Sequence, residues 1–402
     1  MRLCIALLLV TGLSASASLS PLQLLVDLTP AGQTLRPPPG TYTGSLIIRK
    51  PIVLDGQGHV TLDGGGVGTV LTIEADGAVV RNTHLTGSGN SHDSVDAAIL
   101  ITADNVLVAN NVIDDVLFGV HISQGNGNVV RGNRIQSRPV HPTLRGDGIR
   151  LWYSRENRIE CNAITQVRDL VFTNSPDNLL RENQITHSRM GLELIFSHKV
   201  EIVGNTFREN DHGIVGIYSD DLHIHCNRIE HQSNLLGSAI AVKGSSQTLI
   251  EHNEILHCAT GLTANSPTFP ENILYLRNNR FAYNDVALYF YGEKGGHVVH
   301  GNSFEGNFQQ VAVTGPASAR ANDWLGNYWQ DYSGFDRDGD GVGDLPYTVV
   351  LYSERIWMER GMARFFRGTP ALELVDFFER LVPFSEPTMI LQDPKPGMVR
   401  PD

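Results

Sequence analysis

Short alternations of apolar and polar residues recur along most of the chain, and many of them run into an Asn. One example precedes the Asn (Asn105-Val106-Leu107-Val108), and a second alternation follows after a Gly (Gly119-Val120-His121-Ile122). A period of two is typical of a strand, whereas a helix would show apolar residues three and four apart. The pattern therefore predicts repeats built from two or three short strands each.

The repeat is defined by an Asn followed two residues later by a large aliphatic or aromatic residue. From Asn111 onward the steps between copies are 22, 29, 21, 22, 22, 26, 26 and 23 residues, and the earliest copy, at Asn82, is one residue off register. A recurring period in this range predicts a solenoid. The copies are at Asn82, Asn111, Asn133, Asn162, Asn183, Asn205, Asn227, Asn253, Asn279 and Asn302.

A parallel β-helix is the solenoid that fits these spacings, with coils stacked roughly 4.8 Å apart. We expect each motif Asn to sit at a turn, to adopt left-handed backbone, and to bond the amide of the next coil. The hydrophobe two residues later should point into the bore. Ile185, Phe207 and Ile229 should then lie over one another.

Composition and charge narrow the functional classes. The chain has 40 Gly among 402 residues and 18% charged residues, which suits a turn-rich β protein. Its net charge of −12 excludes a nucleic-acid partner, because phosphate binding needs a basic face. Residues 1–17 carry Arg2, an apolar run and Ala15-Ser16-Ala17, which predicts a secretory signal peptide and a soluble mature protein outside the cytoplasm.

Three cysteines remain after the signal peptide. Cys161 and Cys226 precede motif Asn residues in coils three apart, roughly 14 Å at the coil rise, which is too far for a disulfide. We expect these cysteines to be small buried fillers, with copper ligation as the alternative.

An acidic loop follows the repeats. Carboxylates at positions 1, 3, 5 and 9, with Gly at position 6, match most of a calcium-binding loop, although Tyr347 stands where the twelfth-position Glu belongs. A solvated acidic turn is the alternative. The predicted calcium ligands are Asp336, Asp338, Asp340, the Val342 carbonyl and Asp344.

A single helix is predicted over 370–382, with Thr369 as N-cap and Pro370 at the first helical position. Its apolar stripe at i, i+3, i+4 and i+7 either caps the open end of the solenoid or docks a partner. The stripe consists of Leu374, Phe377, Phe378 and Leu381.

Coil register also predicts which side chains share an external column. The seventh residue after successive motif Asn residues gives one such column, so Met190 and His212 should be neighbours. A thioether beside an imidazole suits Cu(I), and His187 and Glu193 flank the pair. His121 should share the column of Glu193. The column members are Phe118, Asp169, Met190, His212 and Asn234.

Two other functional classes stay open. Parallel β-helices also serve carbohydrate-active enzymes such as polysaccharide lyases, epimerases and hydrolases, whose acid and base could come from Asp114-Asp115, Asp147, Asp169 and His212. Adjacent Asp114 and Asp115 would point to opposite faces, which weakens them as a pair. The third class is a plain binding scaffold.

Several stretches together resemble one family, NosD, the periplasmic proteins of nitrous oxide reductase maturation in denitrification. They are Arg145 to Trp152, Val167 to Val171, Gly326 to Trp329, Asp338 to Tyr347 and, most specifically, Phe365-Phe366-Arg367-Gly368-Thr369-Pro370-Ala371-Leu372. The resemblance implies a non-enzymatic factor that handles copper for the copper–sulfur site of the reductase. It also implies partners: a NosF/NosY-like ABC transporter, a NosL-like copper chaperone and the NosZ-like apo-reductase.

The predicted fold is therefore all-β: a right-handed, single-stranded parallel β-helix with a C-terminal acidic metal loop and a short amphipathic helix. Transient copper and structural calcium are the expected cofactors, and no catalytic residues are expected. The predicted domains are a signal peptide at 1–17, the β-helix at 18–325, the acidic loop region at 326–350 and a tail at 351–402 with helix 370–382.

Overall fold

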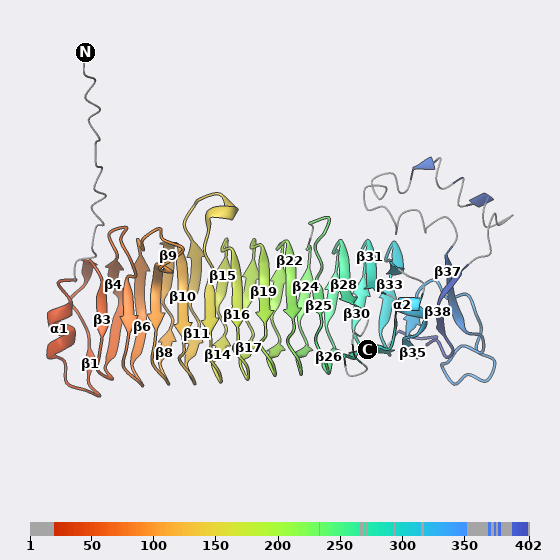
Figure 1. The fold of residues 1–402 in the computed structure, drawn as a ribbon, viewed down its shortest axis with the longest axis horizontal. Coiled ribbons are helices and arrows are strands. Elements are labelled where there is room, and N and C mark those ends of the chain that lie inside the picture. Colours follow the sequence, from red (N-terminus) through yellow and green to blue (C-terminus); the bar gives the residue numbers. More distant parts are fainter. Residues whose placement is uncertain are drawn as a thin grey trace, which may run out of the picture.

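The computed structural model describes residues 20–400, except 233, 266–268, 270–271, 293, 315–316, 352–368, 371–373, 375–376 and 379–387. The described chain winds into an elongated all-β solenoid whose coils stack along one axis (Figure 1). The predicted signal peptide lies outside the described residues. No helix in the described ranges has the length and apolarity needed to cross a bilayer.

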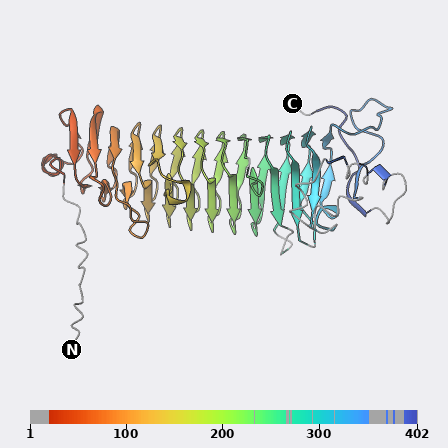
Figure 2. The same ribbon diagram turned by 90° about the horizontal axis from the view of Figure 1, so that it is seen from above.

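One wall of the solenoid is a 12-stranded parallel sheet with one strand from each coil (Figure 2). Its strands alternate buried and outward-facing residues, as the period of two predicts. They are β3 (Leu46–Ile48), β5 (Leu71–Ile73), β7 (Ala97–Ile101), β10 (Phe118–Ser123), β13 (Ile149–Trp152), β16 (Asp169–Thr173), β19 (Met190–Ile195), β22 (His212–Ile217), β25 (Ile240–Lys243), β28 (Thr260–Asn265), β31 (Val286–Tyr291) and β34 (Gln309–Val313).

The second sheet has 24 strands, because most coils contribute two short strands separated by the motif Asn. The strands that precede the Asn are β8 (Leu107–Ala109), β11 (Val129–Arg131), β14 (Arg158–Glu160), β17 (Leu179–Arg181), β20 (Glu201–Val203), β23 (His223–His225), β26 (Thr248–Glu251), β29 (Leu274–Arg277), β32 (Val298–His300) and β35 (Asp323–Leu325). Those that follow it are β9 (Val112–Val116), β12 (Arg134–Ser137), β15 (Ala163–Thr165), β18 (Gln184–Thr186), β21 (Thr206–Arg208), β24 (Arg228–Glu230), β27 (Glu254–Leu256), β30 (Arg280–Ala282), β33 (Ser303–Glu305) and β36 (Tyr328–Trp329). The first coils supply β1 (Thr34–Leu35), β2 (Gly40–Thr43), β4 (Val53–Asp63) and β6 (Val79–Thr86).

The predicted ladder of amides is confirmed. Asn183 Nδ2 donates to Asn205 Oδ1 at 3.0 Å, and Asn205 Nδ2 donates to Asn227 Oδ1 at 3.0 Å. The same bond links each motif Asn from Asn111 to Asn302, and it continues one coil further to Asn327. Thr83 takes the motif position in the earliest coil, which explains why Asn82 is one residue off register.

Left-handed backbone was expected at the motif Asn, but the structure places it one residue earlier. From Asn111 onward the motif Asn residues have no positive φ; the residue before each one does, as at Glu182 (φ 55°) and Gly204 (φ 65°), and in the earliest coil the residue before Thr83 is Asn82 (φ 53°). The reason is burial. The motif side chain must point inward to reach the next amide, whereas a side chain at the left-handed position points out of the turn.

This geometry also corrects the expectation for two cysteines. Cys161 and Cys226 occupy left-handed positions (φ 53° for both) and are exposed, so they are not core fillers. Cys258 is buried as expected, and burial raises the pKa of its thiol to about 12.

The bore is filled by side chains in register. Ile185 pairs with Phe207 and Phe207 with Ile229, and all three are fully buried, which confirms the predicted stack. Toward the C-terminus the same column becomes aromatic. Phe281, Phe304, Trp329 and Tyr347 stack ring on ring, with centroid distances of 5.4, 4.3 and 4.4 Å.

The C-terminal end of the bore is closed by an antiparallel pair, β37 (Tyr347–Leu351) and β38 (Thr388–Asp393). Ile390 and Leu391 of β38 are buried in the main core cluster. The Asp393 carboxylate accepts the last amide of the ladder, Asn327 Nδ2, at 2.9 Å. Two further short helices in the described part of the chain are α2 (Ala317–Arg320) and the 3-10 helix η1 (Pro142–Leu144).

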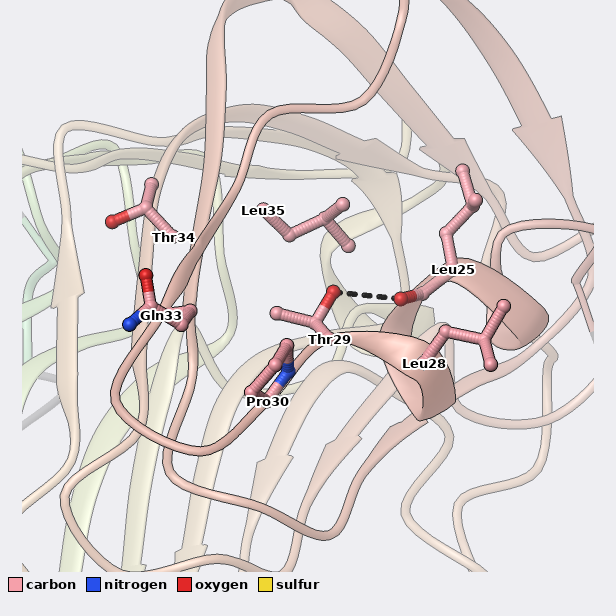
Figure 3. Close-up of a pocket in the computed structure, with 7 residues that line it drawn as sticks. All are labelled: Leu25, Leu28, Thr29, Pro30, Gln33, Thr34 and Leu35. Atoms are coloured by element: carbon pink, nitrogen blue, oxygen red, sulfur yellow. Dashed lines mark hydrogen bonds between the residues drawn. The ribbon is translucent and has the colours of Figure 1, made fainter.

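The N-terminal end is covered by α1 (Gln23–Leu28), which the sequence pattern did not indicate. Leu22 and Val26 pack into the core, while Gln23 Nε2 donates to Ile47 O at 2.9 Å. A hollow beside α1 is lined by Leu25, Leu28, Thr29, Pro30, Gln33, Thr34 and Leu35 (Figure 3). It holds no charged side chain, so it offers no chemistry of its own.

Candidate functional site

The outer face of the 12-stranded sheet carries the predicted column. Met190 begins β19 and His212 begins β22, and the two are partners in the strand register, as expected. Asp169 is the register partner of Met190 on the other side and accepts the Met190 N–H at 3.0 Å. The structure therefore places a thioether and an imidazole on adjacent coils, roughly 4.8 Å apart along the axis.

The column ends at His212. Asn234 does not continue it, because that coil has a longer step; Asn234 lies in an exposed loop and accepts the Leu236 N–H. Ser238 takes the place beside His212, and its N–H reaches His212 Nδ1 at 3.4 Å. Counting a fixed number of residues from the motif Asn therefore predicts the wrong column member wherever the coil length changes.

His187 and Glu193, which were predicted to flank the Met190–His212 pair, have different surroundings. His187 sits in a left-handed turn and pairs with Glu209, Nε2 to Oε2 at 2.7 Å. Glu193 stands in the next outward column, whose order His121, Arg150, Val171, Glu193 confirms that His121 and Glu193 share it. Neither joins a group of three or more His, Cys, Asp or Glu side chains placed to hold a metal among the described residues.

Beside this column lies a buried charge network. Asp147 and Asp169 are each 1% exposed. Arg168 Nη2 donates to Asp147 Oδ1 at 2.8 Å and Arg168 Nε lies 3.3 Å from Asp169 Oδ2, while Arg189 donates to the same oxygen. Arg150 lies 3.5 Å from Asp147 Oδ2. Each carboxylate thus has cationic partners, the arrangement that buried charges require.

Burial shifts the pKa values of several titratable groups on this face. It raises the pKa of Asp147 despite Arg168, and it raises the pKa of Glu193, with Asp169 adding to the effect. Burial lowers the pKa of His212, and burial with Arg150 lowers the pKa of His121 to about 4. Both imidazoles are therefore held neutral, which is the form that binds metals. Perturbed pKa values of this kind concentrate at functional sites.

The sequence alone did not indicate the roles of Arg168 and Arg189. In the sequence these two residues stand out only as the adjacent pairs Arg-Asp at 168–169 and Arg-Met at 189–190. The pairing across coils depends on side-chain conformations, which register does not specify. Burial lowers the pKa of Arg189, but its hydrogen bond to Asp169 and the attraction of the Asp169, Glu193 and Asp147 carboxylates together outweigh burial, and the pKa of Arg189 is raised.

The acid and base proposed for sugar chemistry do not form a free pair. Asp147 and Asp169 are both held by arginines, and Asp114 binds His84 Nε2 at 2.8 Å on a neighbouring coil. Asp115 is in a left-handed turn (φ 49°). A general acid–base pair needs carboxyl groups that reach the substrate with separated pKa values. The geometry does not favour a glycosidase-type site.

The acidic loop brings together three of its predicted ligands. Oxygen atoms of Asp336, Asp338 and Asp340 lie within 4.8 Å of one another. Asp344 is turned to the Arg337 N–H, at 3.0 Å, and Asp340 Oδ1 accepts the Val342 N–H at 2.8 Å. Gly339 and Gly341 supply the positive φ values that the tight turn needs.

Part of the predicted docking stripe is described. Pro370, Leu374, Phe377 and Phe378 have helical backbone, and the three apolar side chains are 54%, 56% and 52% exposed. Leu381 lies outside the described residues. The pair β37 and β38, rather than these side chains, covers the end of the bore.

Comparison with known proteins places this site in context. A family model described as "Periplasmic copper-binding protein (NosD)" matches residues 137–334, which include Met190 and His212. Two proteins named "Probable ABC transporter binding protein NosD" are similar over most of the chain. The Pseudomonas aeruginosa protein is 28% identical, covering 86% of this chain and 83% of its own. The Stutzerimonas stutzeri protein is 26% identical, covering 98% and 93%.

Among solved structures, the A-module of the Azotobacter vinelandii mannuronan C-5 epimerase AlgE6 is similar, with a TM-score of 0.59. It is 17% identical and covers 75% of this chain and 93% of that one. At this identity the likeness shows the fold alone, a parallel β-solenoid, and does not transfer the activity.

Proposed function

Since the chain belongs to the NosD family of periplasmic copper-binding proteins, we propose that it is a non-enzymatic periplasmic accessory factor for maturation of the copper–sulfur site of nitrous oxide reductase. In this proposal it receives copper from a NosL-like chaperone and acts with a NosF/NosY-like ABC transporter and the NosZ-like apo-reductase. The names of the two relatives, which call them transporter binding proteins, support the transporter partner. The proposed winding of the solenoid is right-handed.

The observation that carries the proposal is the match of the family model to the coils that bear the Met190–His212 pair. A thioether and a neutral imidazole are soft enough to hold Cu(I). Glu193 and His187 are proposed as further ligands that approach when copper arrives. Burial and the Asp169 carboxylate raise the pKa of Glu193, so a proton competes for this carboxylate more than for a free one, which suits transient rather than permanent binding.

The same proposal gives roles to the chain's ends. Residues 1–17 direct export, 18–325 form the binding body and 326–350 hold structural calcium through Asp336, Asp338, Asp340, the Val342 carbonyl and Asp344. Within 351–402, helix 370–382 docks the transporter through Leu374, Phe377, Phe378 and Leu381. The exposure of the first three side chains supports docking, because exposed large apolar side chains in a cluster are typical of interaction sites.

The test is anaerobic Cu(I) titration of the mature protein against a chromophoric chelator, with the double variant Met190→Leu/His212→Gln. We expect at least a ten-fold weaker Cu(I) affinity, and a reductase with a depleted copper–sulfur site when the variant replaces the native gene. The matched control is Met398→Leu/His300→Gln, which removes the same two residue types outside the column.

Two results would contradict the proposal. Unchanged Cu(I) affinity in the Met190/His212 variant would remove copper from this column. A strain that lacks the protein and still makes reductase with a full copper–sulfur site would end the maturation role.

A further inference from the structure

A second cluster of metal-binding side chains lies on the outer face of the 24-stranded sheet, away from the column of Met190. It is formed by Glu201 of β20, His223 and His225 of β23 and Glu251 of β26, and these three strands are parallel neighbours. The two histidines face outward together because Ile224 between them is buried in the bore. The solenoid thus sets four ligand side chains on adjacent positions of a rigid surface.

The contacts cross between coils. His225 Nε2 lies 3.0 Å from Glu201 Oε1 on one neighbouring coil, and His223 Nε2 lies 2.9 Å from Glu251 Oε1 on the other. The two imidazole rings stack, with centroids 4.0 Å apart and planes 19° apart. Arg277, the register partner of Glu251, lies over the Tyr275 ring.

The spacing is close to that of a coordination sphere. Ligand atoms of Glu201, His223 and His225 all lie within 4.8 Å of one another. Two ligands at about 2.0–2.2 Å from one metal can be no more than about 4.4 Å apart. Rotation of the exposed Glu201 side chain would cover the remaining few tenths of an ångström. Glu251 lies outside this group of three but contacts His223, and rotation of its side chain would bring in the second carboxylate.

The donor chemistry selects the metal. Two imidazoles with two carboxylates suit Zn(II) and Cu(II), which are borderline cations, whereas Cu(I) prefers thiolate and thioether ligands. We propose that Glu201, His223, His225 and Glu251 form a surface site for a borderline divalent transition metal, distinct from the Cu(I) column. This site does not depend on the proposed function, because its metal, its ligands and its sheet are all different.

The experiment is titration of the purified mature protein with Zn²⁺ against a chromophoric competitor at neutral pH. We expect one equivalent to bind, and the double variant His223→Ala/His225→Ala to weaken Zn²⁺ binding at least ten-fold. The matched control is His231→Ala/His257→Ala. These are two exposed histidines whose rings stack 5.1 Å apart on the same solenoid, outside the cluster.

A spectroscopic arm identifies the ligands. Cu²⁺ bound at the site should give an electron paramagnetic resonance signal split by two imidazole nitrogens, and the splitting should disappear in His223→Ala/His225→Ala. Glu201→Gln and Glu251→Gln should each weaken Zn²⁺ binding while they leave the circular dichroism spectrum unchanged. Unchanged Zn²⁺ affinity in the double histidine variant, or no saturable binding by the native protein, would overturn the site.

Discussion

At the scale of single residues, the motif Asn holds one coil to the next by more than one bond. Asn205 accepts from the Asn183 N–H and Nδ2, and its own Nδ2 donates to Leu180 O at 2.8 Å, Val203 O at 3.1 Å and Asn227 Oδ1 at 3.0 Å. Apart from half-buried Val203, the residues that carry these groups are buried, so the groups need their partners. An alanine at this position would leave several of them unsatisfied at once.

We therefore predict that Asn205→Ala lowers the free energy of unfolding by about 3–5 kcal/mol, since each buried group left without a partner costs about 1–3 kcal/mol. Urea unfolding followed by circular dichroism measures this. Gln184→Ala, on an exposed amide of the preceding coil, is the control and should change stability by about 0.5 kcal/mol or less. A loss in Asn205→Ala no larger than in the control would show that the ladder is not a main source of stability.

Single residues also show which features could be predicted from the sequence and which could not. The spacing of the Asn motif predicted the ladder, the stack of Ile185, Phe207 and Ile229, and the Met190–His212 neighbours. It did not predict that the left-handed residue precedes the Asn, because the pattern marks a turn without its dihedral angles. The exposure of Cys161 and Cys226 follows from that same shift of one position.

At the scale of elements, the acidic loop brings like charges close together. The Asp340 N–H lowers the pKa of Asp338, but repulsion from the Asp340 carboxylate and the hydrogen bond to Asp336 together outweigh it, and the pKa of Asp338 is raised. The Gly341 N–H, by contrast, lowers the pKa of Asp336. A divalent cation would relieve this repulsion, because it replaces carboxylate–carboxylate contacts with carboxylate–metal contacts.

Calcium should therefore raise the melting temperature of the mature protein by about 2 °C or more at saturating concentration, and EGTA should reverse the shift. The double variant Asp338→Asn/Asp340→Asn should lose the response, whereas Asp323→Asn, an exposed carboxylate outside the loop, should keep it. The absence of both a thermal shift and heat in calorimetric titration would leave the loop as a solvated acidic turn.

The closing element at the C-terminus could not be read from the sequence. Asn327 bonds Asp393, which lies 66 residues further along the chain. Strand β38 pairs with β37 in antiparallel orientation, and no local repeat in the sequence predicts this pairing. The predicted helix was the only local signal in this region. Long-range closure of this kind depends on which surfaces are left unpaired once the coils have stacked, so it follows from the three-dimensional structure.

At the scale of the whole molecule, buried neutral histidines make stability depend on pH. His297 is 1% exposed, and burial lowers its pKa to about 4. The unfolded chain has the ordinary pKa of about 6.5, so it binds more protons than the folded chain between pH 6.5 and pH 4. The stability that neutral His297 contributes is therefore fully present above pH 6.5 and is lost as the pH falls through this window. The lowered pKa of His121 changes stability in the same direction.

We predict that His297→Gln reduces the difference in unfolding free energy between pH 7 and pH 5 by about 2 kcal/mol. The pH difference, rather than stability at one pH, is the readout, because Gln also changes packing. His59→Gln, at an exposed position, should leave the difference unchanged. An equal pH difference in the native protein and His297→Gln would mean that His297 is protonated in the folded state.

The amide ladder has a direction as well as a length. From Asn111 to Asn302 each side chain donates one Nδ2–H to the Asn of the following coil, and Asn327 donates to Asp393, so the side-chain dipoles add head to tail along the axis. Their positive end meets the Asp393 carboxylate, in the same sense in which an anion stabilises the N-terminus of a helix. The rod is thus electrically polarised, and the charge that neutralises its pole comes from the strand that closes the bore.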